Sequence, residues 1–581
     1  MIEVLRPLGA DTARGLRLAA RALSVATGPT AVVAPDLVIA DAALAQITAD
    51  PFAGTAMLVR PSLQGDTRVR HHLVNSVGSA FHQVTAPDHV FVGALVVASR
   101  DAKTVGEAIA VTADALESGA LDGNEHDVTQ LIAVAIVRSG TPCRAIELVD
   151  VPWFRNPVDP VSAAQAVSAV SDARIAQLQS NRMDDGFYST FVVRRLSKPL
   201  TRLALRLNMS PNAVTLVSFA VGMGAAGAFA AGSRWALILG AVLLQLSLVI
   251  DCVDGEVARA TRKFSALGAW LDASTDRVKE YLAYAGLAIG AAAVTGVNIW
   301  PLAILMLVLQ TTRHMTDYDF GRVQRSREAR VEPRAVTDPD DGSSTTESGW
   351  SVQGAMEMSS RINRRSGVRW AKRAIHMPIG ERWLVISLAA AFLGAAWALG
   401  LLLGLGLVAL AYVTTGRILR TLGWAGEAPA DAALLLARQS DAGLVASVLA
   451  RGLSTARWQR FWSSRAAWAV PAGLRFLELG VVALLCLSAF PGLMVLGFWW
   501  MAIIAFHHYD TLYRAIAGQA PPRWLVWSGL GWDGRTIIIV LAALGGLAVL
   551  GGLLVVGIVV WSLLLVFVAS IQWLASFGHR D

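Results

Sequence analysis

Residues 251–277 read DCVDGEVARATRKFSALGAWLDASTDR and place four aspartates, Asp251, Asp254, Asp272 and Asp276, beside strongly apolar segments. A carboxylate in or near hydrocarbon costs about 2.5 to 3.5 kcal/mol on insertion scales, so four of them require compensation. Spacings of three and four residues put each pair of aspartates on one face of a helix. Two helices joined by a short turn can therefore direct all four carboxylates at one site.

A divalent metal ion is the most direct compensation for these carboxylates. Oxygen-only ligation favours Mg²⁺ or Mn²⁺, which bind carboxylates and phosphate oxygens together. A diphosphate substrate fits such a site, and Arg259 adds a planar guanidinium that suits phosphate. Gly255 and Gly268 carry no side chain and leave room for a bulky ligand. Because coupled carboxylates need not share one role, Asp276 is our candidate for accepting a proton from an attacking hydroxyl.

The alternative is that the aspartates only form salt bridges with Arg259, Arg262 and Arg277. For a single aspartate at a helix end this is the more common situation. It loses weight here because the stretch matches the pattern D-x2-D-G-x2-A-R-x8-G-x3-D-x3-D at every position. That pattern is the signature of the CDP-alcohol phosphotransferase family, and the chain resembles this family.

The resemblance implies a six-helix membrane unit that transfers a substituted phosphate from a CDP-linked donor to an alcohol and releases CMP. It implies that Asp251, Asp254 and Asp272 hold metal with the diphosphate, and that Asp276 also reaches metal and acts as the base. A homodimer is a further implication. A lipid donor such as CDP-diacylglycerol and a soluble donor such as CDP-inositol fit the same aspartates equally well.

The resemblance also implies a set of nucleotide-binding positions. The segment SPNAVTL before the first apolar run matches a second, shorter motif of the family, in which Asn and Thr approach the nucleotide. The expected nucleotide-binding residues are Gly255, Ala258, Arg259, Gly268, Asn212 and Thr215.

Composition places this site in a membrane protein. Of the 581 residues, 54% are hydrophobic and 16% charged, with a mean hydropathy of +0.51, which argues against a disordered or wholly soluble chain. Three widely spaced cysteines cannot form a disulfide framework or a cysteine-based zinc site. The net charge of +7 comes with arginines in juxtamembrane loops that lack stacking aromatics, so we expect no nucleic-acid partner.

The apolar runs predict a multi-span α-helical membrane protein with about ten spans. Six form the phosphotransferase unit and about four follow it. The first six are expected near 212–232, 234–252, 270–294, 297–317, 382–399 and 400–419, and the others near 472–489, 491–507, 536–552 and 554–574.

Four regions follow from this pattern: a soluble α/β domain (1–180), an interfacial amphipathic helix interrupted near Pro199 (187–208), the six-span unit with a polar loop at 320–381 (209–421), and a C-terminal membrane domain of unknown role (422–581). The Arg-rich loops all fall on one side if the first domain is cytoplasmic. We therefore expect a multi-pass protein of the cell (inner or plasma) membrane, with the active site and both termini facing the cytoplasm.

The order of regions resembles bifunctional enzymes that make CDP-inositol and condense it with inositol phosphate. In those enzymes the soluble part is a cytidylyltransferase. Here Val151–Val167 resembles, with several departures, the segment that closes the active site of sugar nucleotidyltransferases. The Gly-rich loop that those enzymes carry near the N-terminus is missing from this sequence. We expect a degenerate, nucleotidyltransferase-like domain, in which Asp159 is a turn residue rather than a metal ligand.

Three further motifs are less specific. Arg313, near His314 and Asp317, is a candidate for binding a phosphorylated acceptor such as an inositol phosphate, although it could equally be a positive anchor. His507, His508 and Asp510 suggest a metal site, but adjacent histidines point to different faces, which favours an interfacial role. The segment GWDGRT at 531–536 predicts no function. A non-catalytic transporter or scaffold would explain the hydropathy but not the paired aspartates.

Overall fold

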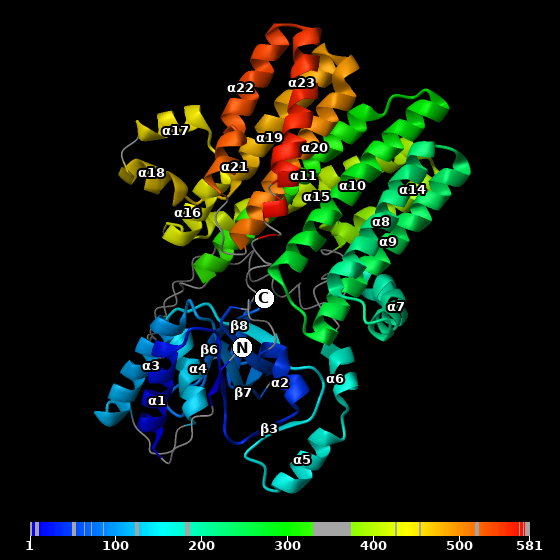
Figure 1. Cartoon of the computed structure of the whole chain (residues 1–581). Coiled ribbons are helices and arrows are strands. Elements are labelled where there is room, and N and C mark those ends of the chain that lie inside the picture. The colour runs from blue at the N-terminus through cyan, green and yellow to red at the C-terminus, as the bar shows by residue number, and fades with distance from the viewer. Residues whose placement is uncertain are drawn as a thin grey trace, which may run out of the picture. The chain divides into compact units, whose positions relative to one another are not determined.

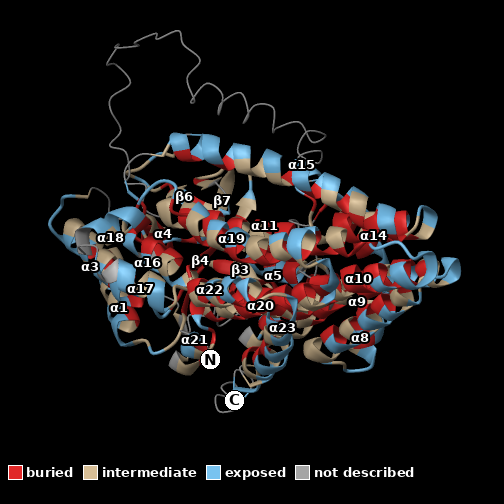
Figure 2. Cartoon of the chain, turned by 90° about the horizontal axis from the view of Figure 1, so that it is seen from above, coloured by how far each residue is buried: buried red, intermediate tan, exposed pale blue. Residues whose placement is uncertain are grey.

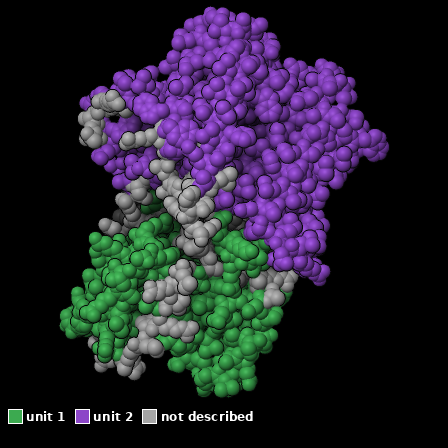
Figure 3. All heavy atoms as spheres, in the orientation of Figure 1, with its two compact units in different colours: residues 1–182, 256–265, 326–343 green, residues 183–255, 266–325, 344–581 purple. Residues whose placement is uncertain are grey.

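The computed structural model describes residues 3–5, 11–48, 54–62, 64–70, 72–84, 86–121, 127–179, 186–328, 374–424, 427–452, 455–516, 522–568, 570–572 and 575. The chain divides into two compact units (Figure 3). The first comprises residues 1–182, 256–265 and 326–343, and the second comprises 183–255, 266–325 and 344–581.

The first unit is built on a seven-stranded mixed sheet in the order β1-β2-β7-β4-β8-β6-β5. Its strands are β1 (Glu3–Leu5), β2 (Thr30–Val33), β4 (Ala56–Pro61), β5 (Thr67–Arg70), β6 (Leu73–Val77), β7 (His89–Val97) and β8 (Arg144–Glu147). Strand β7 runs antiparallel to β2 and β4, whereas β4 and β8 are parallel. A separate two-stranded sheet pairs β3 (Leu37–Ile39) with β9 (Trp153–Arg155).

Helices cover both faces of this sheet. Side chains of β7 alternate between two cores, with Phe91 and Leu95 in one and Val92 and Ala94 in the other, as the period of two in a strand requires. Helices α1 (Thr12–Val25), α3 (Ala102–Glu117) and α4 (Val128–Arg138) complete the first core, and α2 (Asp41–Thr48) and α6 (Asp172–Gln179) the second. The first unit is therefore an α/β region, as the sequence predicts.

Asp159 stands at the start of a helix. It is the N-cap of α5 (Pro160–Ser168), and its carboxylate accepts hydrogen bonds from the backbone N–H groups of Val161 and Ser162. The expected role as a turn residue is confirmed.

The second unit consists of helices (Figure 1). The segments up to residue 422 are η1 (Ser189–Val193), α7 (Arg194–Arg206), α8 (Pro211–Ala231), α9 (Arg234–Thr261), α10 (Ala266–Thr295), α11 (Trp300–Glu328), α14 (Ile379–Phe392) and α15 (Ala395–Leu422). The later ones are α16 (Ala430–Gln439), α17 (Leu444–Arg451), α18 (Thr455–Trp462), α19 (Ala469–Leu484), η2 (Leu485–Ala489), η3 (Pro491–Leu493), α20 (Met494–Ile516), α21 (Arg523–Ser528), α22 (Gly531–Leu544), α23 (Leu547–Trp561) and η4 (Ser562–Val568).

Seven helical segments of the described chain are long and apolar enough to cross a membrane, so the protein is a multi-pass membrane protein. They are Pro211–Ala231, Arg234–Thr261, Ala395–Leu422, Ala469–Ala489, Pro491–Ala515, Trp524–Leu544 and Leu547–Gln572. Helices α10 and α11, with 30 and 29 residues, are also long enough, at about 1.5 Å per residue. They differ from the seven because charged residues are concentrated in one half of each helix, the first half of α10 and the second half of α11.

Several predicted boundaries are wrong. The expected span at 382–399 crosses a break, since α14 ends at Phe392 and α15 begins at Ala395. The boundary expected near residue 553 lies at Gly545–Gly546, between α22 and α23. The polar loop was expected from residue 320, but α11 continues to Glu328, because Phe320 and Val323 enter a small apolar core. Much of the expected loop, residues 329–373, lies outside the described chain.

The predicted interruption at Pro199 is also wrong, because α7 runs through this residue. A proline removes one backbone hydrogen bond, and the rest of the helix compensates for that loss. The small and polar side chains of Ser197, Thr201 and Ala204 face the protein, whereas Leu196 and Leu203 are half exposed. An outward apolar face suits the expected interfacial position, which stays a prediction.

One hydrophobic core joins the helices on both sides of residue 422. It includes Tyr284 of α10 and Leu307 of α11 together with Phe498 of α20 and Leu554 of α23. Figure 2 shows exposed residues along one side of α15. Leu401, Leu405 and Val408 of this helix are exposed apolar residues, as expected for a helix that faces lipid. The C-terminal helices are therefore packed into the same body as the helices that carry the aspartates.

Candidate active site

The four aspartates lie on two successive helices. Asp251 and Asp254 belong to α9, and Asp272 and Asp276 to α10. Carboxylate oxygens of the first three all lie within 4.8 Å of one another. Opposite ligands of a single Mg²⁺ ion are about 4.2 Å apart, at about 2.1 Å from the ion each, so small side-chain movements allow shared ligation. The residues present therefore fit a divalent metal.

Hydroxyl groups from α8 orient the two aspartates of α9. Thr215 Oγ1 donates to Asp254 Oδ2 at 2.6 Å, and Ser218 Oγ donates to Asp251 Oδ1 at 3.1 Å. Thr215, expected to approach the nucleotide, is thus in contact with a predicted metal ligand. Such outer hydrogen bonds fix the orientation of ligating carboxylates.

A buried lysine connects the two pairs of aspartates. Lys279 Nζ lies 2.6 Å from Asp251 Oδ1 and 3.0 Å from Asp276 Oδ1, and its side chain is fully buried. Gly222 of α8 makes room for it, because a Cβ atom there would lie 2.7 Å from Lys279 Cδ. Lys279 thereby brings Asp276 into the same group as the other three aspartates.

One of the alternative salt bridges would join Arg277 to the aspartates, but the described contacts of Arg277 are with other residues. Its guanidinium pairs with Glu280 at 2.9 Å and lies 3.0 Å from His314 Nδ1. Glu280 also binds Arg382 of α14 at 2.8 Å. Arg277 therefore belongs to a second charged network, next to the aspartates along α10.

The other predicted nucleotide-binding positions lie on the same helices. Gly255, Ala258 and Arg259 follow Asp254 on α9, and Gly268 precedes Asp272 on α10. Asn212 lies in the first turn of α8, behind the N-cap Ser210. Their contact with a nucleotide stays a prediction.

Arg313 is buried on α11 and has spare hydrogen-bonding capacity. One terminal nitrogen donates to the backbone carbonyl of His376, whereas Nε and Nη1 have no hydrogen-bond partner in the described part of the chain. A buried guanidinium with two unused donor nitrogens is costly unless a ligand completes it. Its neighbours have other partners: His314 binds Tyr509, and Asp317 binds Arg417.

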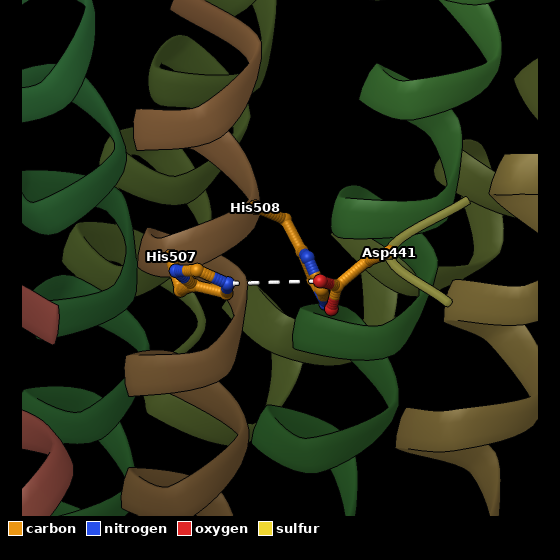
Figure 4. A group of neighbouring side chains, drawn as sticks. All are labelled: Asp441, His507 and His508. Atoms are coloured by element: carbon orange, nitrogen blue, oxygen red, sulfur yellow. Dashed lines mark ion pairs between the residues drawn. The ribbon is translucent and has the colours of Figure 1, made fainter. Parts of the chain in front are cut away.

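A second cluster of possible metal ligands lies among the C-terminal helices (Figure 4). Asp441, His507 and His508 place one ligand atom each within 4.8 Å of the others. Both histidines are buried inside the protein, and the expected interfacial role stays a prediction. His508 Nε2 lies 3.2 Å from Glu478, and His507 Nε2 lies 4.0 Å from Asp441.

Arginines already balance the charge of this cluster. Arg535 binds both Glu478 and Asp441, at 2.5 and 2.6 Å, and Arg475 binds Glu478 at 3.0 Å. Burial alone would raise the pKa of Asp441, but the two guanidiniums outweigh it and lower this pKa to about 2. Two acids and two arginines form a neutral group, so an added divalent cation would face uncompensated repulsion. The cluster is better suited to holding helices together.

The GWDGRT segment supplies part of this structural cluster. Arg535 is its arginine, and Asp533 accepts hydrogen bonds from the backbone N–H groups of Gly443 and Ala446 at the start of α17. Gly531 has φ +65°, and a Cβ atom there would lie 2.2 Å from the Gly443 nitrogen. Only glycine fits this turn.

Comparison with known proteins agrees with the geometry of the aspartate site. Residues 208–331 match the family model described as CDP-alcohol phosphatidyltransferase. The chain carries a domain of the CDP-alcohol phosphatidyltransferase family. Residues 414–580 match a different model, described as a family of unknown function.

Relatives of the CDP-alcohol phosphatidyltransferase domain occur in bacteria and archaea. A bifunctional IPC transferase and DIPP synthase of Rubrobacter xylanophilus is 40% identical over 119 residues, which are 20% of this chain and 26% of the relative. A phosphatidylinositol phosphate synthase of Mycolicibacterium smegmatis is 32% identical over 133 residues, 23% of this chain and 58% of the relative. An archaetidylinositol phosphate synthase of Aeropyrum pernix is 36% identical over 119 residues, 20% and 56% of the two chains.

In each case the chain spans less than two thirds of the relative's length. The similarity therefore concerns the domain and not the whole protein.

The first unit contains a cavity of about 560 Å³. Asp66 and Gln130 are among its lining residues and hydrogen-bond to each other at 2.8 Å. Asp127, the second acid of the lining, pairs with Arg155. Both acids of this cavity are therefore engaged with other protein groups.

Sequence reasoning missed two members of the aspartate site. Lys279 is three residues after Asp276, and Ser218 is three residues after Thr215, so both lie on helix faces already identified. That spacing was the available signal.

Proposed function

We propose that the protein is a metal-dependent membrane CDP-alcohol phosphotransferase. The observation that carries this proposal is the convergence of Asp251, Asp254 and Asp272, with Asp276 linked to them by Lys279, inside a domain of that family. Mg²⁺ or Mn²⁺ held by the aspartates would neutralise the diphosphate of a CDP-linked donor. Gly255, Ala258, Arg259, Gly268 and Asn212 would line the nucleotide site.

The residues suggest the following reaction. The acceptor hydroxyl oxygen forms a bond to the phosphorus that carries the donor alcohol, and the bond from this phosphorus to the CMP oxygen breaks. The hydroxyl proton passes to Asp276, and CMP leaves with the electron pair of the broken bond. Thr215 and Ser218 keep the carboxylates of Asp254 and Asp251 oriented during this exchange.

We further propose an acceptor that carries phosphate, such as an inositol phosphate. The two unpartnered nitrogens of buried Arg313 support this choice, because a phosphate can accept from both. The names of the relatives also point to inositol-containing products. The donor would be either CDP-diacylglycerol or CDP-inositol.

The remaining expectations accompany this proposal. We place the active site and both termini on the cytoplasmic side of the cell membrane, on the positive-inside argument. The homodimer rests on the resemblance alone. We propose that residues 1–180 form a degenerate, nucleotidyltransferase-like domain, which predicts no pyrophosphate release from CTP with inositol phosphate.

CMP release tests the proposed function. The full chain is purified in lipid and supplied with Mg²⁺ or Mn²⁺, each CDP-linked donor, and inositol phosphate, inositol or glycerol phosphate. We expect acceptor-dependent CMP that disappears when the metal is chelated. A transporter or scaffold would release no CMP in any of these mixtures.

A further inference from the structure

Four consecutive residues of α20, His507, His508, Tyr509 and Asp510, are all buried. Successive residues of a helix point in directions about 100° apart, so the four side chains meet different neighbours. Two face the charged cluster of the C-terminal helices, and two face the helices of the aspartate site. This short segment therefore joins the part of the chain with unknown function to the phosphotransferase domain.

Asp510 contacts the helix that carries Asp272. Its Oδ1 atom accepts a hydrogen bond of 3.1 Å from the indole nitrogen of Trp270. Trp270 is buried and stands two residues before Asp272 in the first turns of α10. Asp510 is held in turn by Arg514, one helical turn later, at 2.7 Å. The hydrogen bond fixes the start of α10 relative to α20.

Tyr509 contacts the network beside Asp276. Its hydroxyl lies 2.8 Å from His314 Nδ1, and the Arg277 guanidinium lies 5.9 Å from the centre of its ring. Arg277 directly follows Asp276 and also lies within hydrogen-bonding distance of His314. Tyr509 therefore supports the residue next to the proposed base from two directions. One turn further along α20, the hydroxyls of Tyr513 and Tyr318 lie 2.9 Å apart.

The other side of the segment is anchored firmly. His508 contacts Glu478, and His507 faces Asp441 across 4.0 Å. Arg475 and Arg535 hold both acids. Buried charged groups that are paired in this way favour one position of the helix. The C-terminal helices thus fix the position of α20 along and about its axis. Through Tyr509 and Asp510, α20 in turn fixes the position of the first turns of α10.

We propose that Tyr509 and Asp510 are positioning residues of the aspartate site, supplied by the region of unknown function. The inference rests on the proposed function, because it assigns that region a part in the same reaction. Neither residue is placed among the metal ligands. Partners that orient ligating groups typically change metal affinity or activity by 10–100-fold when they are lost.

The test uses the full chain in lipid and three variants. Asp510→Leu removes the acceptor for Trp270, whereas Asp510→Asn keeps an oxygen there and serves as the conservative rescue. Tyr509→Phe removes only one hydroxyl, so it should fold even if Asp510→Leu does not. Tyr412→Phe is the matched control, since Tyr412 is exposed on α15.

Two readouts are measured on each folded variant: Mn²⁺ affinity by electron paramagnetic resonance, and kcat with KM for CMP release. Loss of the wild-type Mn²⁺ signal in Asp254→Asn assigns that signal to the aspartates. We expect Asp510→Leu and Tyr509→Phe to lower Mn²⁺ affinity or kcat by about 10–100-fold, and Asp510→Asn to recover most of this loss.

The outcomes separate the two proposals. Folded variants whose Mn²⁺ affinity and kcat stay within about twofold of wild type would overturn the positioning role and leave the proposed function intact. A wild type that binds Mn²⁺ but releases no CMP would overturn the proposed function, and Mn²⁺ affinity would still decide the positioning role. A wild type without Mn²⁺ binding contradicts both.

Discussion

Lys279 is a fully buried cation between Asp251 and Asp276, and it neutralises part of the charge that a metal would otherwise neutralise. We therefore predict that Lys279→Met destabilises the protein most strongly without metal. Removing one partner of a buried ion pair costs about 3–5 kcal/mol. Added Mg²⁺ should restore much of this loss, because it binds only the folded site.

Thermal unfolding in lipid with and without Mg²⁺ checks this prediction. The rise in Tm on adding Mg²⁺ should be larger for Lys279→Met than for wild type. An equal or smaller rise would show that Lys279 and the metal do not share the aspartates.

The residues of the site could be predicted from the sequence only in part. Spacings of three and four residues, together with the cost of carboxylates near hydrocarbon, were enough to group the four aspartates. The sequence did not show that Thr215 and Ser218 would contact them, since α8 and α9 are separate helices whose rotation depends on tertiary packing. The partners of Arg313, Tyr509 and Asp510 depend on packing in the same way.

At the level of elements, the close contact of α8 with α10 depends on glycine. A Cβ atom at Gly222 would meet buried Lys279, whereas one at Gly400 on α15 would meet nothing within 4 Å. We predict that Gly222→Ala lowers metal-dependent CDP affinity by about tenfold or more, because Lys279 must move against the aspartates that it positions. Gly400→Ala should leave the affinity unchanged.

Equilibrium binding of CDP in Mn²⁺ checks the glycine prediction. Equal affinities for the two variants would mean that the contact between Gly222 and Lys279 does not influence the site.

Helix ends were the least predictable part of the elements. Apolar residues continue across the breaks at Gly394 and Gly546, so hydropathy alone could not separate α14 from α15 or α22 from α23. Both glycines have positive φ, +102° and +90°. A turn of this kind does not change the mean hydropathy of the segment around it. Likewise, the polar composition at the end of α11 predicts a loop. The helix continues there because Phe320 and Val323 pack against the C-terminal helices.

At the scale of the whole molecule, the charged cluster around Glu478 holds the C-terminal helices in one arrangement. We predict that Arg535→Met lowers the free energy of unfolding by about 3–5 kcal/mol, because Glu478 and Asp441 would each lose a buried partner. Arg420→Met is the control, since Arg420 is exposed on α15. Denaturant unfolding in lipid gives both values, and similar losses would contradict a structural role for the cluster.

Two features of the whole molecule could be anticipated and one could not. Composition and hydropathy predicted a multi-span protein preceded by an α/β region, and both are present. The sequence could not show that one apolar core runs from the aspartate-bearing helices into the C-terminal helices, because the contributing residues are up to several hundred positions apart. That continuity makes a role for the C-terminal helices in the site physically reasonable.

The most direct test of the account is CMP release by wild type, Asp276→Asn and the exposed control Asp172→Asn, measured side by side in lipid with Mn²⁺ and an active donor and acceptor. We expect Asp276→Asn to fold and to release CMP about 10²–10⁴-fold more slowly, the contribution typical of general base catalysis, and Asp172→Asn to match wild type. Unchanged CMP release by Asp276→Asn would contradict the account.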